Sequence, residues 1–336
     1  ISSSGGLCQM PSRFSFDGAL MFAFRAPHVR SFPWIFSAAF AGVFTAFLLL
    51  IMLLASGDAR EVISAFEALD QAGFDDDDPR VLISLVLGAF EPLIGWGVFA
   101  MLGSWVIWAV FESASQRRYI RDEGFSLGFG GDELRMMGVG FCWAVLQAVF
   151  TLLPLFMIFG SIMGIFDLID SGASEDEIAR SIIGPIFGAL GVWFLLFLVY
   201  IFFATRLAPC FALTIKDREF RFLDAWNVSR GRFWPILGAY VIITIVGGIV
   251  VSIAEQILEF GLIGVLTPAL GDAETGEDFL RAFMSGGVLV VLAVYFLIRL
   301  FLSGLLMHVA GGPAALAARH DPRGGVDDAL QADVFN

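Results

Sequence analysis

The chain is 336 residues long, and 58% of its residues are hydrophobic while only 16% are charged, which gives a net charge of −13 and a mean hydropathy of +0.82. Soluble globular proteins carry about 25% charged residues. This shortfall excludes a soluble enzyme of average composition and a disordered chain, and the acidic balance excludes a basic nucleic-acid binder. A membrane protein with several spans remains.

The stretch before the first apolar segment, residues 1–31, is predicted to be a cytoplasmic N-terminal region. Its first nine residues are small and polar, and they lack the basic and apolar parts of a signal peptide. We expect Met10 to be the native start and residues 1–9 to be a tag, an extension or the result of a misplaced gene boundary. Phe14 and Phe16 are expected to begin an elbow that lies at the membrane interface before the first span.

Six segments supply the about 20 mostly apolar residues that a helix needs to cross the roughly 30 Å hydrocarbon layer. Each is too long and too continuously apolar for a barrel strand, in which apolar and polar residues alternate. The sequence therefore predicts an all-α polytopic protein with a transmembrane domain over 32–312 and a cytoplasmic tail over 313–336. The predicted spans are residues 32–54, 81–111, 137–166, 182–204, 234–253 and 288–309.

The distribution of charge predicts the orientation of these spans. Loops rich in Lys and Arg stay in the cytoplasm. The N-terminal region, the loops after spans two and four, and the C-terminal tail together hold 15 of the 20 basic residues. The three other loops hold 19 of the 33 acidic residues. Both termini are therefore predicted to be cytoplasmic, with a strongly acidic outer face.

A weak internal repeat precedes the odd-numbered spans. Phenylalanine-containing segments begin at Phe14, Phe125 and Phe220, separated by 111 and 95 residues. The exits of spans four and six also match, since Ala208-Pro209 leads to Lys216-Asp217 as Gly312-Pro313 leads to His320-Asp321. We interpret the chain as three tandem units, each an interfacial elbow followed by a helix hairpin.

The third elbow is predicted to be a helix that lies flat on the membrane. Leu223, Trp226, Arg230 and Phe233 follow one another at three- and four-residue steps and so share one side of a helix. Aromatic side chains would enter the headgroup boundary while the arginines reach anionic lipid phosphates. The alternatives are a structural anchor and a sensor of lipids or partners. The residues assigned to this interface are Phe220, Arg221, Phe222, Trp226, Arg230 and Arg232.

The sequence around this elbow resembles a known group of proteins. The stretch Arg206-Leu-Ala-Pro209, followed by Asp224-Ala-Trp226-Asn-Val-Ser229-Arg-Gly231 and a span from Trp234, is similar to bacterial six-helix inner-membrane proteins. They include the YciC-like proteins and the membrane domain attached to some glycerophosphodiester phosphodiesterases. The resemblance covers about 40 of the 336 residues. It implies a bacterial cytoplasmic membrane protein of that architecture and carries over no activity.

Two ionisable residues within the predicted spans are candidates for function, because charge is costly in a bilayer. Glu91 in span two and Arg299 in span six lie at about 15 and 16 Å from the outer ends of their spans, at 1.5 Å per residue. We predict that they form an ion pair. Pro92 next to Glu91 predicts a break in the helix. The pair would serve either as a structural clamp or as part of a proton or cation path.

Other sites are predicted to be structural. His308 is interpreted as a hydrogen-bonded packing residue, and the three scattered cysteines have no metal-site spacing, so no metal or cofactor is expected. Gly160 with Gly164, and Gly188 with Gly191, would let helix backbones approach closely, either within the bundle or on docking to another membrane protein.

Three functions remain open. The sequence favours a non-catalytic accessory, assembly or scaffold subunit of a larger membrane complex, because no catalytic constellation is found. A small transporter or channel that uses Glu91 and Arg299 is the alternative. An enzyme acting on lipid has only the arginine-rich elbows in its favour. The expected partners are anionic lipid headgroups at the cytoplasmic face and other membrane-protein subunits, and no nucleic acid.

Overall fold

The computed structural model describes residues 14–25, 31–72, 79–172, 174–271, 273, 275–321 and 323–324, and all regular secondary structure in these residues is helical. Six segments of the described chain are long and apolar enough to cross a membrane, which confirms the all-α polytopic fold. The helices are α1 (Phe16–Arg25), α2 (Phe32–Leu54), α3 (Ser56–Ala72), α4 (Pro79–Ala89), α5 (Glu91–Arg121), α6 (Gly131–Asp170), α7 (Glu175–Leu207), α8 (Cys210–Asp217), α9 (Ala225–Val228), α10 (Phe233–Leu270), α11 (Gly276–Phe283) and α12 (Gly286–Arg319).

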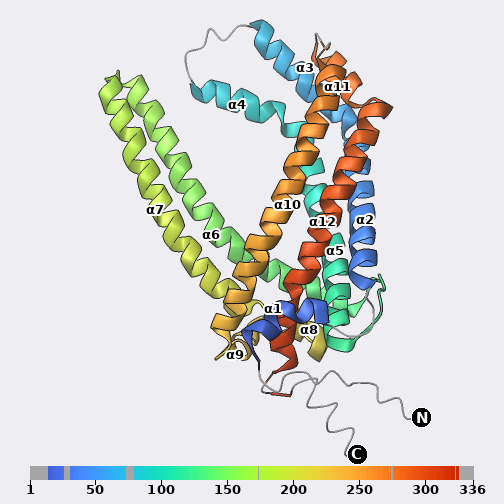
Figure 1. Ribbon diagram of the computed structural model, residues 1–336. Helices are drawn as coiled ribbons and strands as arrows, with labels where there is room; N and C mark the ends of the chain where they lie inside the picture. The colour runs from blue at the N-terminus through green and yellow to red at the C-terminus, as the bar shows by residue number, and fades with distance from the viewer. Residues whose placement is uncertain are drawn as a thin grey trace, which may run out of the picture.

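The two ends of the bundle differ in structure (Figure 1). The short helices α1, α8 and α9 lie together at one end, here termed the basal end, and α3 and α11 lie at the opposite, distal end. The segments that the charge distribution assigns to the cytoplasm lie at the basal end. Residues 1–13 and most of the tail, from 325 onward, lie outside the described residues, so the prediction that Met10 is the native start concerns residues that the structure does not describe.

Several helices extend beyond the predicted spans. The helix α10 continues to Leu270, so Glu255 lies within a helix and not in an outer loop. Predicted span two is divided at Phe90 into α4 and α5, and Pro92 occupies the first turn of α5. Proline fits that position because its missing N–H has no helical acceptor there. The loop predicted between spans one and two contains α3, against which α11 packs.

The basal end holds the main buried core. Residues 111–120 of α5, residues 212–215 of α8 and residues 312–319 of α12 are all buried, and the three helices contact one another there. Many core positions are alanine, which lets helices approach closely. Each segment follows an even-numbered predicted span. The core is therefore built from equivalent parts of the three predicted units.

The elbows before the odd-numbered spans differ from one another. The first contains α1, which packs against α10 and α12. The second, residues 122–130, has no helix. The prediction that Leu223 to Phe233 form one flat helix is wrong, because only Ala225–Val228 is helical and turns follow it. Gly231 explains the interruption, since its φ of +78° lies outside the helical region.

The helices α2 and α12 make the most extensive contact in the bundle. Gly304 of α12 lies against α2 so closely that a Cβ atom there would be 3.2 Å from both the Cα of Ser37 and the ring of Phe40. By contrast, a Cβ atom at Gly42 of α2 would meet nothing within 4 Å. Gly304 therefore sets the distance between the two helices.

We predict that Gly304→Val lowers the free energy of unfolding by about 1–3 kcal/mol, because the added atoms force the two backbones apart. Thermal unfolding in detergent measures the effect. The matched control Gly42→Val should leave Tm unchanged or slightly raised, since valine has a higher helix propensity than glycine. Equal effects of the two changes would contradict the assignment.

Candidate functional site

The structure does not form the predicted pair of Glu91 and Arg299. Arg299 instead donates through Nε to Glu255 Oε1 of α10 at 2.8 Å. This ion pair connects α10 to α12. Glu91 is exposed in the first turn of α5. The prediction failed because its depth estimate counted residues along one span from 81 to 111, although α4 ends at Ala89 and α5 begins at Glu91, and because it placed Glu255 in a loop.

The residues of the third elbow lie partly exposed at the basal end. Phe220, Trp226 and Arg230 are exposed, whereas Phe222, Arg221 and Arg232 are half-buried. Arg232 donates to the carbonyl oxygens of Val228 and Ala317 and lies over the ring of Phe14. Two of the three arginines that the sequence assigned to the lipid interface, Arg221 and Arg232, thus form hydrogen bonds within the protein.

Arg206 connects the parts of the motif on which the family resemblance depends. Its guanidinium carbon lies 5.3–5.7 Å from the ring centroids of Phe202, Trp226 and Phe233, and Nη1 donates to the carbonyl oxygen of Ser229 at 3.2 Å. Cation–π contacts are most favourable when the cation is partly desolvated, as here. Arg206, Trp226 and Ser229 therefore share a structural role, which is to hold the third elbow against the end of α7.

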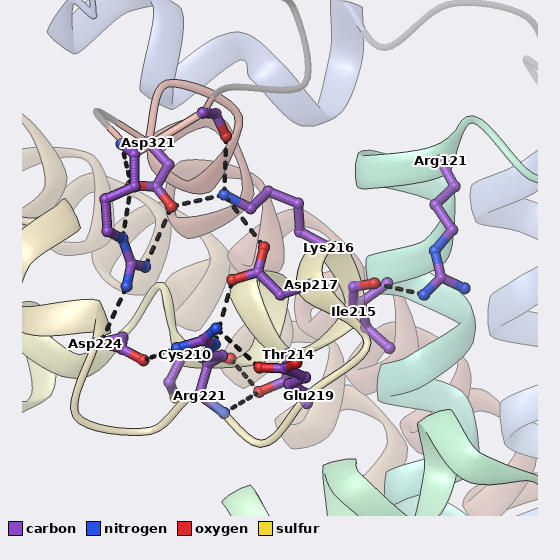
Figure 2. Close-up of polar contacts among 12 residues, drawn as sticks. Arg121, Cys210, Thr214, Ile215, Lys216, Asp217, Glu219, Arg221, Asp224 and Asp321 are labelled. Carbon is purple, nitrogen blue, oxygen red and sulfur yellow. Dashed lines mark hydrogen bonds and ion pairs between the residues drawn. The ribbon is translucent and has the colours of Figure 1, made fainter. Parts of the chain in front are cut away.

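A chain of ion pairs joins α8, the third elbow and the segment after α12 (Figure 2). Lys216 Nζ donates to Asp321 Oδ2 at 2.6 Å, and Arg323 donates to the same carboxylate through its backbone N–H at 3.0 Å. Arg323 also pairs with Asp224 at 3.0 Å, and Arg221 donates to the other oxygen of Asp224 at 2.9 Å. The arrangement alternates in charge, so each carboxylate lies between two cations.

The ion pairs shift the pKa values of their members. Burial alone would raise the pKa of Asp321, but hydrogen bonds from Arg323 and Lys216 outweigh burial, and the pKa lies below its ordinary value. The hydrogen bond to Asp224 raises the pKa of Arg221. Both groups are therefore ionised at neutral pH, and the network has a structural function at the basal end.

A second network fixes α5 to α6. Arg117 donates to Glu133, and Arg121 donates to Asp132 at 2.7 Å. Arg121 also donates to the carbonyl oxygen of Ile215, which connects α5 to α8 (Figure 2). Because Asp132 and Glu133 lie in the first turn of α6, their charge also complements the positive end of the helix dipole.

A cavity of about 1040 Å³ lies beside the basal core. Residues of α5, α6, α7, α8, α10 and α12 line it, and most of these residues are apolar or aromatic. Phe197 of α7, Val241 and Ile245 of α10, and Ala144 and Gln147 of α6 line the cavity and are themselves exposed, so it opens between α10 and the α6–α7 hairpin. The cavity is therefore reached from the side of the bundle that would face lipid.

Two polar side chains of α5 line this cavity and were missed by the sequence analysis. Glu112 and Gln116 are buried, at 7% and 1% exposure, and Gln116 Nε2 donates to Glu112 Oε1 at 2.7 Å. Span two was predicted to end at Phe111, so both residues were assigned to the cytoplasm. Their four-residue spacing, which puts them on one helix face, was the available signal.

The prediction for His308 is confirmed. Its Nδ1 lies 2.8 Å from Ser115 Oγ, and its ring stacks on Tyr119 at 4.7 Å between centroids. Within the described residues, no group of three or more His, Cys, Asp or Glu side chains could hold a metal ion. The lining of the cavity offers a carboxyl group, amide and hydroxyl groups, and aromatic faces.

Comparison of the chain with known protein families, curated proteins and solved structures gives no match.

We predict that Asp321→Asn lowers the free energy of unfolding at pH 7 by about 1.5–3 kcal/mol, the range for hydrogen bonds to charged groups. A lowered folded-state pKa contributes stability that is present above the unfolded-state pKa and is lost as pH falls through the folded-state pKa. The difference between the two proteins should therefore shrink below about pH 4, near the ordinary pKa of aspartate. Thermal unfolding at several pH values measures it.

The control is Glu277→Gln, which removes an ion pair with Arg281 whose side chains are 73% and 71% exposed. Its effect should be small at every pH, because exposed pairs contribute about 0–1 kcal/mol. A pH-independent loss in Asp321→Asn would contradict the role of the charge.

Proposed function

We propose that the protein is a non-catalytic accessory or assembly subunit of a larger complex in a bacterial cytoplasmic membrane, with its basal end in the cytoplasm. The observation that carries the proposal is the position of the hairpin formed by α6 and α7. Toward the distal end, this hairpin diverges from α10 and stands apart from the other long helices (Figure 1). It offers a long apolar surface to other membrane proteins.

The surface of the hairpin supports this function. Phe156 of α6 and Phe187 of α7 are 66% and 70% exposed, and many other large apolar side chains of both helices are exposed as well. The hairpin's aromatic contacts with α5, α8 and the third elbow, such as Trp105 with Phe141 and Phe203 with Trp226, lie near the basal end. The distal part of the hairpin is therefore free to contact a partner.

The exposed glycines of the hairpin suit contact with another helix and not only with lipid. A Cβ atom at Gly160, Gly164, Gly188 or Gly191 would meet nothing within 4 Å among the described residues. These glycines thus do not serve close packing inside the bundle, which was one of the two alternatives. Small residues at such spacing favour the close approach of another transmembrane helix.

Transport is the second candidate, and the observation in its favour is the pair of buried polar residues, Glu112 and Gln116, beside a cavity. Transport paths usually combine several intramembrane polar groups with broken helices in corresponding repeats. Here the break lies at Phe90, on the distal side of α5 and 22 residues before Glu112. The accessory function therefore has the stronger support.

Contact with anionic lipid at the basal end is part of the proposal. Trp226 and Arg230 are exposed there, and so is Trp234 in the first turn of α10. Tryptophan at the headgroup level and arginine near lipid phosphates are typical of a cytoplasmic membrane interface. These side chains would fix the depth of the bundle while the hairpin contacts its partner.

We predict that the double variant Gly160→Leu with Gly164→Leu releases the protein from its complex. Leucine side chains at these open positions leave the fold intact but block close approach by a second helix. Native mass measurement after mild solubilisation from native membranes tests this. The wild-type protein should appear in a particle heavier than its own 36.6 kDa, and the double variant should appear alone.

The matched control is Gly261→Leu with Gly264→Leu on α10, where a Cβ atom also meets nothing within 4 Å. This control should remain in the complex. A wild-type protein that is found alone, or only as a homodimer, would contradict the accessory function and favour transport.

A further inference from the structure

The cavity beside the basal core contains hydrogen-bonding groups that the protein itself does not satisfy. Gln116 Oε1 is buried and has no hydrogen-bond partner, although its amide nitrogen donates to Glu112. Glu112 forms no ion pair within the described part of the chain. A buried polar oxygen without a partner costs about 1–3 kcal/mol, and a buried carboxylate without a counter-charge costs more. A ligand that donates hydrogen bonds to both groups would remove this cost.

Close packing against α12 accommodates Gln116 at the cavity wall. A Cβ atom at Gly311 of α12 would lie 2.9 Å from Gln116 Nε2, so only glycine leaves room for the amide in its present position. Both side chains line the cavity, together with Gly311. The amide of Gln116 thus packs closely against α12 at the cavity wall, and its Nε2 donates to Glu112.

We propose that the cavity is a binding site for a membrane-soluble amphiphile with a positively charged amine headgroup. An alkylammonium supplies three N–H donors and one positive charge, which match the carboxylate of Glu112 and the unpaired oxygen of Gln116. An alcohol of the same length would satisfy one acceptor and leave the carboxylate without a counter-charge. A fatty acid would place a second negative charge next to Glu112.

The aromatic lining also favours a cation. Trp105, Trp108, Trp143 and Tyr240 line the cavity around the acidic group. The faces of indole and phenol rings attract ammonium groups, and the attraction grows when water is excluded. The lining thus combines with the carboxylate to select positive charge.

The size and opening of the cavity fit an amphiphile. Its volume of about 1040 Å³ is at the upper end of the roughly 300–1,000 Å³ of small-molecule sites. The opening between α10 and the α6–α7 hairpin is lined mostly by apolar side chains, including Phe197, Val241 and Ile245, with the amide of Gln147 among them. An alkyl chain can therefore leave through this opening into lipid while the amine remains at Glu112. The site does not depend on whether the hairpin binds a partner.

Calorimetric titration of the full chain in a neutral detergent tests the inference, with dodecylamine, dodecanol and dodecanoate as probes. At pH 7 the amine is protonated, since alkyl amines have pKa values near 10.4. We expect dodecylamine to bind at least about tenfold more tightly than dodecanol, a difference of about 1.4 kcal/mol. Dodecanoate should bind most weakly. Equal affinities for amine and alcohol, or a preference for dodecanoate, would overturn the proposal.

Two pairs of variants separate the charge from the cavity. Glu112→Gln should abolish the preference for the amine. It should retain dodecanol binding, which also shows that the variant is folded. The matched control Glu259→Gln, on the exposed face of α10, should change neither the amine preference nor dodecanol binding. Ala204→Phe, which fills the cavity, should abolish binding of all probes, whereas Val199→Phe at an exposed position of α7 should not. Retention of the amine preference in Glu112→Gln, or of binding in Ala204→Phe, would overturn the assignment.

Discussion

The packing of three helix ends at the basal end is the interaction on which the rest of the structure depends. The ends of α5 and α12, and α8, bury polar residues against one another, and burial of polar groups is favourable only where hydrogen bonds satisfy them. Tyr119, for example, donates to the carbonyl oxygen of His308, and Arg319 donates to that of Tyr119. These bonds fix the register of the helix ends, and the long helices extend from this core.

The same constraint explains why the polar cavity lies where it does. The ends of α5 and α12 and the start of α8 pack on one another and also line the cavity, which α6, α7 and α10 complete. Glu112 and Gln116 are thus part of the helix that supports the core and part of the cavity wall. Gly311 of α12 leaves room for the amide of Gln116, since a Cβ atom there would lie 2.9 Å from Nε2.

The fold was predictable from sequence, since apolar stretches of sufficient length specify the spans by themselves. The candidate site was not. Predicted span two ended at Phe111 because Glu112 to Arg118 is a polar run, and nothing local to that run indicates that α8 and α12 cover it. The prediction of a Glu91–Arg299 pair failed for a different reason. Its depth calculation did not include the change of direction at Phe90 or the long helix that carries Glu255. Pairing depends on tertiary geometry, which periodicity does not contain.

The unequal lengths of the helices have a consequence for the surrounding bilayer. At 1.5 Å per residue, the 23 residues of α2 span about 34 Å, close to the hydrocarbon thickness, whereas the 40 residues of α6 span about 60 Å. These helices cannot both match the same bilayer when upright, so α6 must lean or project beyond the lipid. The helices α10 and α12, with 38 and 34 residues, are also longer than the hydrocarbon layer, so they too must lean or project. The angle of the hairpin would change with membrane thickness, while the basal core keeps its shape.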